Sequence, residues 1–227
     1  MKKISILVPV YNEKDSLLEL IKRVENVDFG LEKEIILIDD FSTDGTRNLY
    51  ENISHKVLYH EFNQGKGAAL RTGLSEATGD IIIVQDADLE YNPQDYLPLV
   101  ELIKEDKYDV VYGSRFLNEE NNKRFLILSF IANKTLTMIT NLLFKANLTD
   151  METCYKAFKK EFIKNIVIKS NRFDFEPEIT AKVLKQNLRF TELPITYNGR
   201  AFNEGKKITW KDGLQAIFTL IKYRFKD

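Results

Sequence analysis

The sequence predicts an α/β fold with a mostly parallel, Rossmann-like sheet that carries helices on both faces. Through the first half of the chain, apolar runs of strand length alternate with segments whose apolar residues recur at helical spacing. The apolar runs are nearly continuous, as in parallel strands that are buried on both faces. Sheets of this kind bind ligands beyond the carboxyl ends of their strands.

Each expected element follows from its own local pattern. Residues 4–10 are an apolar run of strand length, and in 15–24 the apolar residues fall on one helical face. The run at 34–38 stops at two aspartates, after which 42–45 supply Ser, Thr, Asp and Gly for a loop and a helix start. The expected strands are 4–10, 34–38, 57–59, 80–84 and 109–112, and the expected helices are 15–24 and 67–77.

Composition and charge limit the classes of partner. The 227 residues include 33 basic and 34 acidic side chains, which gives a net charge of −1. Proteins that bind nucleic acid usually carry a basic excess, so we expect no nucleic-acid partner. The single cysteine, Cys154, excludes an internal disulfide and favours a reducing compartment. Because neither a secretory signal nor an apolar stretch of membrane-spanning length is evident, we expect a cytoplasmic protein.

The strongest local signal is the acidic segment Asp86-Ala87-Asp88-Leu89-Glu90, which directly follows the apolar run 80–84. Carboxylates two residues apart at the end of a buried strand repel each other unless a cation lies between them. Mg²⁺ commonly binds through one or two carboxylates together with substrate phosphates. We therefore predict a site for Mg²⁺ or Mn²⁺ with Asp86, Asp88 and Glu90 as ligands. The alternative is a solvated turn in which Asp88 caps the next helix.

Two further polar clusters follow strands at the same predicted edge of the sheet. In the pair Asp39-Asp40, one carboxylate could accept a hydrogen bond from a pyrimidine or guanine ring, or it could serve the turn alone. In the other cluster, Pro9 stiffens the exit from the first strand, Tyr11 offers a flat face for a base, and Glu13 can meet a ribose hydroxyl. Three such clusters at one edge favour a nucleotide site over unrelated turns.

A fourth signal is weaker. In Gly65-Lys66-Gly67, a lysine lies between two glycines at an expected helix start, where free N–H groups and the helix dipole favour anions. Lys66 and the nearby Arg71 are therefore candidate contacts for a diphosphate. The segment is neither a Walker loop nor a complete G-x-G-x-x-G, and its small residues could equally serve helix packing.

Together these motifs resemble the family 2 inverting glycosyltransferases, which have the GT-A nucleotide-sugar-binding fold, and in particular their dolichyl- and polyprenyl-phosphate mannose or glucose synthase branch. The motifs are V-P-V-Y-N-E, I-D-D-F-S-T-D-G-T, N-Q-G-K-G-A-A-L-R-T-G, Q-D-A-D-L-E and Y-G-S-R-F. The resemblance implies one domain over 1–227, with a nucleotide-sugar and metal half at about 1–115 and an acceptor half at about 116–227.

The resemblance also implies roles for single residues. Arg115 matches an arginine that meets phosphate in this branch, and Arg200 with Lys206 matches a late basic loop near the substrate phosphates. Asp150 lies where the branch has an acidic residue, and Glu90 stands where the branch often has Gln. The residues expected to bind the donor are Pro9, Tyr11, Glu13, Asp40, Lys66, Arg71, Asp86, Ala87 and Lys206.

The expected reaction moves a hexose from a UDP- or GDP-hexose to an acceptor with inversion. Because negative charge grows on the leaving diphosphate, we expect Asp88 with the metal, Arg115 and Arg200 to act there. A polyprenyl or dolichyl phosphate is already ionised and needs no base. A glycan hydroxyl, as in cell-surface polysaccharide synthesis, would need a general base, for which Asp150 is the candidate.

Two other classes of protein remain as alternatives. A nucleotidyltransferase usually has a Gly-rich loop after the first strand, where this sequence has Tyr11-Asn12-Glu13. A non-catalytic protein that binds nucleotide sugars would have no need of intact Asp86 and Asp88.

Two apolar stretches are candidates for binding a lipid acceptor or for a peripheral contact with the inner face of the membrane. Residues 125–144 are apolar but interrupted by polar side chains, so they suit an interfacial segment or an internal groove. A C-terminal stripe lies among basic residues, which suits core packing or, as the less favoured interpretation, a helix near anionic lipid. This stripe consists of Leu214, Ile217, Phe218 and Ile221.

Overall fold

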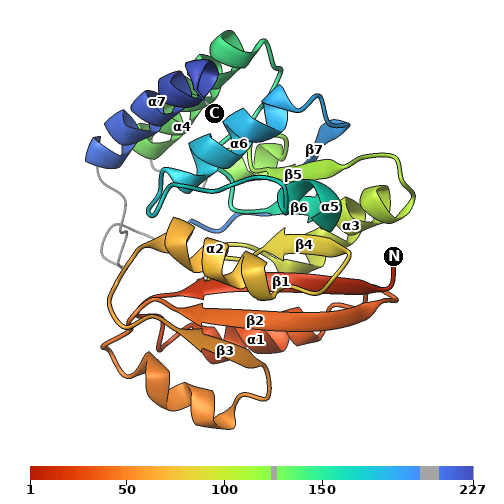
Figure 1. The fold of residues 1–227 in the computed structure, drawn as a ribbon, viewed down its shortest axis with the longest axis vertical. Coiled ribbons are helices and arrows are strands. Elements are labelled where there is room, and N and C mark those ends of the chain that lie inside the picture. Colours follow the sequence, from red (N-terminus) through yellow and green to blue (C-terminus); the bar gives the residue numbers. More distant parts are fainter. Residues whose placement is uncertain (124–126, 200–209, 227) are drawn as a thin grey trace.

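The computed structural model describes residues 1–123, 127–199 and 210–226, and a seven-stranded sheet lies at its centre (Figure 1). The strands are β1 (Lys3–Val10), β2 (Glu32–Asp39), β3 (Lys56–Tyr59), β4 (Ile81–Val84), β5 (Val110–Ser114), β6 (Lys156–Lys159) and β7 (Phe190–Pro194). Their order is β3-β2-β1-β4-β6-β5-β7. Neighbouring strands are parallel except that β6 runs antiparallel to both β4 and β5. The expected α/β fold is confirmed.

Helices cover both faces of the sheet. The helices are α1 (Leu17–Glu25), α2 (Lys66–Glu76), α3 (Tyr96–Lys104), α4 (Ile127–Phe144), α5 (Lys160–Ile163), α6 (Phe175–Lys185) and α7 (Trp210–Phe225), with 3₁₀ turns η1 (Thr46–Asn52), η2 (Pro93–Asp95) and η3 (Glu119–Lys123). In Figure 1, α2 and α6 lie before the sheet and α1 and α3 behind it. Helices α4 and α7 pack against each other and against α6 at one end of the molecule.

The five expected strands and two expected helices all form, and no end is shifted by more than two residues. Strands β6 and β7 were not expected from the sequence. The sequence of β6 is Lys-Ala-Phe-Lys, and all four residues are buried, including Lys156 and Lys159. Lys159 is neutralised by Asp106 and Asp109, and the Lys156 ammonium donates to main-chain carbonyls. Buried lysines are rare unless paired, so composition alone predicts an exposed segment here.

The C-terminal helix corrects one expectation. The favoured interpretation of the C-terminal apolar stripe was packing in the core. In the structure, three of its four residues are exposed: Leu214, Phe218 and Ile221. The face of α7 that packs inward carries other residues instead, and a second hydrophobic cluster forms there with α4 and α6. No helix in the described ranges is long and apolar enough to cross a membrane. The inward face of α7 consists of Ala216, Thr219, Leu220 and Tyr223.

A hydrogen-bonded carboxylate joins the start of the sheet to the loop before β4. Glu34 on β2 accepts hydrogen bonds from the Ser5 hydroxyl, and from the main-chain N–H and hydroxyl of Thr78 at 2.7 and 2.8 Å. Its salt bridge to the Lys3 ammonium measures 2.9 Å. Burial alone would raise the pKa of Glu34, but these donors lower it to about 2. The ionised form of Glu34 is therefore favoured in the folded state.

We expect Glu34→Gln to lower the free energy of unfolding at neutral pH by about 1 kcal/mol, a figure reduced for solvent screening. Because the folded pKa lies below the unfolded value, this contribution is present above about pH 4.5 and is lost as the pH falls towards 2. Urea unfolding between pH 7 and pH 2.5 checks it. Glu51→Gln, on an exposed side chain of η1, is the control, and parallel pH curves for wild type and Glu34→Gln would contradict the prediction.

Candidate active site

The loops that follow β1 and β2 are locked to each other at the carboxyl edge of the sheet. The main-chain N–H of Asn12 donates to the Ser42 hydroxyl at 3.0 Å, and the N–H of Thr43 donates to the Asn12 side-chain carbonyl at 2.8 Å. Asn12 and Phe41 adopt left-handed backbone conformations, with φ of 53° and 68°. Such conformations are uncommon outside glycine and tend to occur at functional sites. The predicted contacts Tyr11 and Glu13 lie in this locked region.

Glu13 is tied into the same arrangement. Its N–H donates to the Thr46 hydroxyl at 3.0 Å, and its carboxylate accepts a hydrogen bond from Ser16 at 2.8 Å. The Ser16 hydroxyl also lies 3.0 Å from the carbonyl oxygen of Ala87. The polar cluster after β1 and the acidic segment after β4 are therefore in contact through Ser16, as their common place at the sheet edge predicts.

The Asp40 carboxylate is buried and surrounded by donors. It accepts hydrogen bonds from the His60 ring at 2.7 Å, the Asn63 amide at 2.8 Å, and the main-chain N–H groups of Gln64 and Gly65 at 2.8 and 2.7 Å. A carboxylate offers about four acceptor positions. A nucleoside N–H could bind Asp40 only by displacing one of these donors. The nucleoside contact stays a prediction, and the structure adds that Asp40 holds the loop that leads into α2.

The neighbouring Asp39 supports an aromatic surface. It is fully buried and accepts hydrogen bonds from Arg47 at 2.6 Å and from the Tyr50 hydroxyl at 2.9 Å. The guanidinium of Arg47 lies 5.3 Å from the Phe41 ring centre and 5.5 Å from that of Tyr59. Both rings are exposed, so with Arg47 they offer an aromatic surface, the Phe41–Tyr59 surface, beside the locked loops. No motif in the sequence marks Arg47, so its place here was not predicted.

Lys66 bridges two carboxylates from different parts of the chain. Its ammonium lies 2.7 Å from the Asp86 carboxylate and 2.7 Å from that of Glu176 on α6. Burial alone would lower the pKa of Lys66, but Asp86 and the other acidic groups raise it well above its usual value. Burial alone would likewise raise the pKa of Asp86, and Lys66 lowers it instead. Glu176 could not be predicted from the sequence, because no local pattern connects it to the acidic segment after β4.

The acidic segment after β4 is joined to the chain beyond β7. Asp88 accepts a hydrogen bond from the N–H of Glu90 at 3.1 Å, and the carbonyl of Glu90 accepts one from the N–H of Asn198 at 2.8 Å. Tyr91 and Tyr197 form an isolated bridge, with ring centres 5.4 Å apart. Burial, followed by the charge of Glu90, raises the pKa of Tyr197. The turn that carries Asp88 is thus held from both sides.

The donor set after β4 fits a metal that a diphosphate helps to bind. In the part of the chain that the structure describes, no three His, Cys, Asp or Glu side chains gather closely enough to hold an ion alone. Asp86 and Asp88 would supply the one or two carboxylates that Mg²⁺ usually takes beside substrate phosphates. The predicted set of three protein ligands is therefore not assembled here, and the place of Glu90 as third ligand stays a prediction.

Arg115, directly after β5, is paired with Asp150. The guanidinium Nε and one terminal nitrogen donate to the two carboxylate oxygens, both at 2.7 Å, and the Arg115 main-chain N–H donates at 3.0 Å. Both side chains are buried, and the Arg115 guanidinium lies 5.3 Å from the Tyr197 ring centre. Asp150 could accept a proton from a hydroxyl only if this pair opened. The base role stays a prediction that the geometry does not favour.

The glycines beside Lys66 serve packing. A Cβ at Gly65 would lie 2.4 Å from the carbonyl oxygen of Asn171, and one at Gly67 would lie 2.5 Å from that of Ser170. Arg71 reaches the same loop, because its guanidinium donates to the Asn171 side chain at 2.8 Å. This supports the packing alternative for the motif. Diphosphate contacts by Lys66 and Arg71 stay predictions.

The remaining predicted residues divide into two groups. Pro9 is the residue before the end of β1, paired in register with Ile38, and Ala87 is the buried residue between Asp86 and Asp88. Arg200 and Lys206 lie outside the described residues, so their predicted contacts with phosphate are not placed.

Glu152 adds a carboxyl group that sequence analysis did not single out. Its Oε1 is buried, with no hydrogen-bond partner among the described residues. Burial first, and then repulsion by Glu176, raises the pKa of Glu152 to about 8. At neutral pH this group is largely protonated and can donate a hydrogen bond.

Residues 5–167, more than half of the chain, match the family model described as Glycosyl transferase family 2. The chain belongs to glycosyl transferase family 2. The resemblance read from the five motifs is thereby confirmed.

Two relatives place the chain within the family. It is 29% identical over 229 residues to dolichol-phosphate mannosyltransferase of Pyrococcus furiosus, which covers 97% of this chain and 64% of that protein. It is 31% identical over 214 residues to undecaprenyl-phosphate 4-deoxy-4-formamido-L-arabinose transferase of Salmonella choleraesuis, which covers 91% of this chain and 63% of that protein. The chain thus spans less than two thirds of the length of either relative. Each of the two names combines a polyprenyl phosphate with the transfer of a sugar, which agrees with the branch that the motifs resemble.

Solved structures share the fold. Glucosyl-3-phosphoglycerate synthase from Mycobacterium tuberculosis, in complex with Mn²⁺, UDP and phosphoglyceric acid, has a TM-score of 0.76 at 17% identity and covers 100% of this chain and 80% of that chain. Its complex with Mg²⁺ and UDP has a TM-score of 0.76 at 16% identity, with the same coverage. At this identity the likeness concerns the fold alone, and it confirms the expected GT-A fold.

We expect Asp40→Ala to lower the free energy of unfolding by about 3 kcal/mol, because it leaves buried donors around His60 and Gly65 without an acceptor. Urea unfolding at pH 7 measures this loss. Asp15→Ala, at an exposed position before α1, is the matched control. A loss no larger than that of the control would show that the loop does not depend on Asp40.

Proposed function

We propose that the protein is a metal-dependent inverting glycosyltransferase that moves a hexose from a nucleotide sugar to a polyprenyl or dolichyl phosphate. One observation carries the proposal: in a family 2 chain, Asp86 and Asp88 leave β4 beside the locked ends of β1 and β2. That edge is where a parallel sheet binds a nucleotide. The relatives with known names support the acceptor class.

We assign separate roles to the residues of the site in binding the donor and in stabilising charge. Tyr11, Glu13 and the Phe41–Tyr59 surface would take the nucleoside, with UDP and GDP as the candidate donors. Asp86 and Asp88 would hold Mg²⁺ or Mn²⁺, which when bound would neutralise charge on the leaving diphosphate. Lys66 keeps the Asp86 carboxylate ionised and fixed in position. UDP complexes with Mn²⁺ or Mg²⁺ in the structurally similar synthase support this assignment.

The burial of Asp150 supports a phosphate acceptor. Asp150 is the carboxylate proposed as general base for a hydroxyl acceptor, and Arg115 occupies both of its oxygens. A phosphate monoester is already ionised near neutral pH, so its attack on the anomeric carbon needs no base. Arg115, fixed by Asp150, would then be oriented towards phosphate charge, and Arg200 is proposed to act with it.

An exposed apolar face on α4 and α7 supports contact with a membrane. The two helices pack side by side, yet Leu128 and Leu142 on α4 are 82% and 81% exposed, and Phe218 and Phe225 on α7 are 62% and 79% exposed. Apolar surface of this kind on paired helices marks an interaction site. Basic residues at the end of α7 suit anionic lipid, which supports peripheral binding at the cytoplasmic face.

Asp88→Ala should abolish transfer and the metal-dependent part of nucleotide binding, while the fold is retained. Thermal shifts with UDP and with GDP, each with and without Mn²⁺, measure binding, since a ligand at 100 times its Kd stabilises by about 2.7 kcal/mol. Asp28→Ala, at an exposed position, is the control. Unchanged Mn²⁺-dependent affinity in Asp88→Ala would contradict the metal assignment.

The acceptor is tested by transfer to short-chain polyprenyl phosphates. We expect turnover on these phosphates and none on free glycans. Turnover on a glycan hydroxyl alone would discard the lipid phosphate and favour Asp150 as base.

The double variant Leu142→Glu/Phe218→Glu should lose binding to anionic vesicles, because it places two charges on the apolar face of α4 and α7. Flotation with vesicles that contain phosphatidylglycerol measures the bound fraction. Leu18→Glu changes an exposed leucine on α1, far from this face in Figure 1, and should bind as the wild type does. Equal binding by all three proteins would contradict the proposed surface.

A further inference from the structure

Glu192 on β7 holds the segment that carries Asp150. Its carboxylate accepts hydrogen bonds from the main-chain N–H of Thr149 at 2.6 Å, from the Thr149 hydroxyl at 2.9 Å, and from the main-chain N–H of Asp150 at 3.0 Å. Both oxygens are therefore used to hold two consecutive residues. The Thr149 hydroxyl is also 2.6 Å from that of Ser114, at the end of β5.

The held segment leads directly to Arg115. Asp150 fixes the guanidinium through two hydrogen bonds, and β5, which ends next to Arg115, pairs in parallel with the strand of Glu192. Asn121 ties the Arg115 carbonyl to the chain beyond β7, because its amide donates to Arg115 at 2.9 Å and to Ile195 at 2.7 Å. A continuous set of contacts thus runs from Glu192 to the arginine proposed to meet phosphate.

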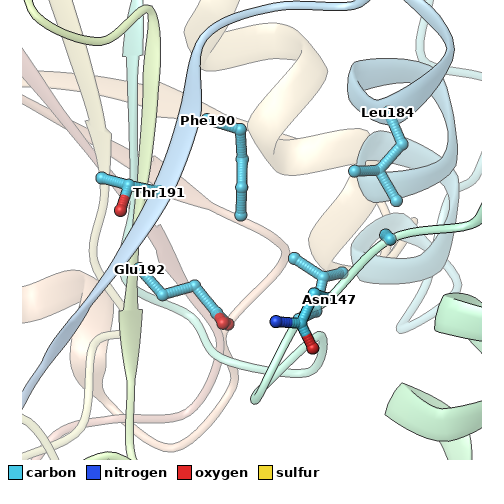
Figure 2. A pocket seen from close by; sticks show the side chains of 7 residues that line it. Asn147, Leu184, Phe190, Thr191 and Glu192 are labelled. Carbon is cyan, nitrogen blue, oxygen red and sulfur yellow. The ribbon is translucent and has the colours of Figure 1, made fainter.

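Glu192 lies on the wall of a cavity of about 340 Å³ rather than in close-packed core. Figure 2 shows its carboxylate reaching from β7 towards the loop with Asn147, with Phe190 projecting from the same strand and Leu184 across the space. Burial raises the pKa of Glu192, and repulsion by the charge of Asp150 adds to it. A cavity wall tolerates an isosteric change, so the effect of Glu192→Gln can be read without a collapse of the core.

We propose that Glu192 is a positioning residue for transfer: it sets the Thr149–Asp150 segment, and through Asp150 the orientation of the Arg115 guanidinium. The inference rests on the proposed function. Glutamine in its place has one carbonyl oxygen for two main-chain donors and turns an N–H₂ group towards the other. Asp150 then loses its fixed position, and Arg115 its alignment with the charge that grows on the phosphate.

The test is a double-mutant cycle on transfer from the nucleotide sugar, with Glu192→Gln, Asp150→Asn and the combination. We expect Glu192→Gln to lower kcat about tenfold with KM for the donor changed less than about twofold, because alignment in the transition state is lost and ground-state binding is kept. The combination should be no slower than Asp150→Asn alone. Glu161→Gln, exposed on α5, is the control and should keep wild-type kcat.

Two results would overturn the inference: losses that multiply in the combined variant, or a Glu192→Gln enzyme with wild-type kcat. Failure of the proposed function looks different, because the wild type would then show no transfer at all. In that case the same cycle on the free energy of unfolding still tests the contact, and additive losses there would reject it.

Discussion

The ammonium group of Lys66 joins the parts of the molecule on which the site depends. It lies between the Asp86 carboxylate at the end of β4 and the Glu176 carboxylate in α6, so one cation connects the start of α2 with both halves of the chain. Removing one partner would leave a charge without compensation, and the burial of Glu176 makes that loss destabilising. The position of Asp86, and with it any metal and diphosphate, follows from this contact.

Close backbone contact is what allows Lys66 to reach both carboxylates. Gly65 and Gly67 let the start of α2 approach the main chain of Ser170 and Asn171 more closely than any side chain would permit. On the other side, Asp40 holds the loop before α2 through main-chain donors. The segment Gly65-Lys66-Gly67 is therefore held rigidly in place, and the charge of Lys66 is already oriented before a substrate binds.

A similar arrangement of buried charges follows β5. Arg115 is a buried cation directly after a strand, Asp150 neutralises it, and Glu192 holds Asp150 in turn. In the proposed function, the charges at the sheet edge and the apolar face on α4 and α7 would have separate tasks. The sheet edge would stabilise charge in the reaction, and the outer helices would contact the surface from which a lipid acceptor comes.

Local patterns of apolar and polar residues were enough to predict the alternation of strands and helices, the acidic segment after β4 and the family. They did not reveal β6, whose lysines are buried, or the exposure of Phe218. The pairing of Lys66 with Glu176 and that of Arg115 with Asp150 became evident only in the folded chain. Contacts between residues far apart in the chain leave no periodic signal, since the folded backbone alone brings their charges together.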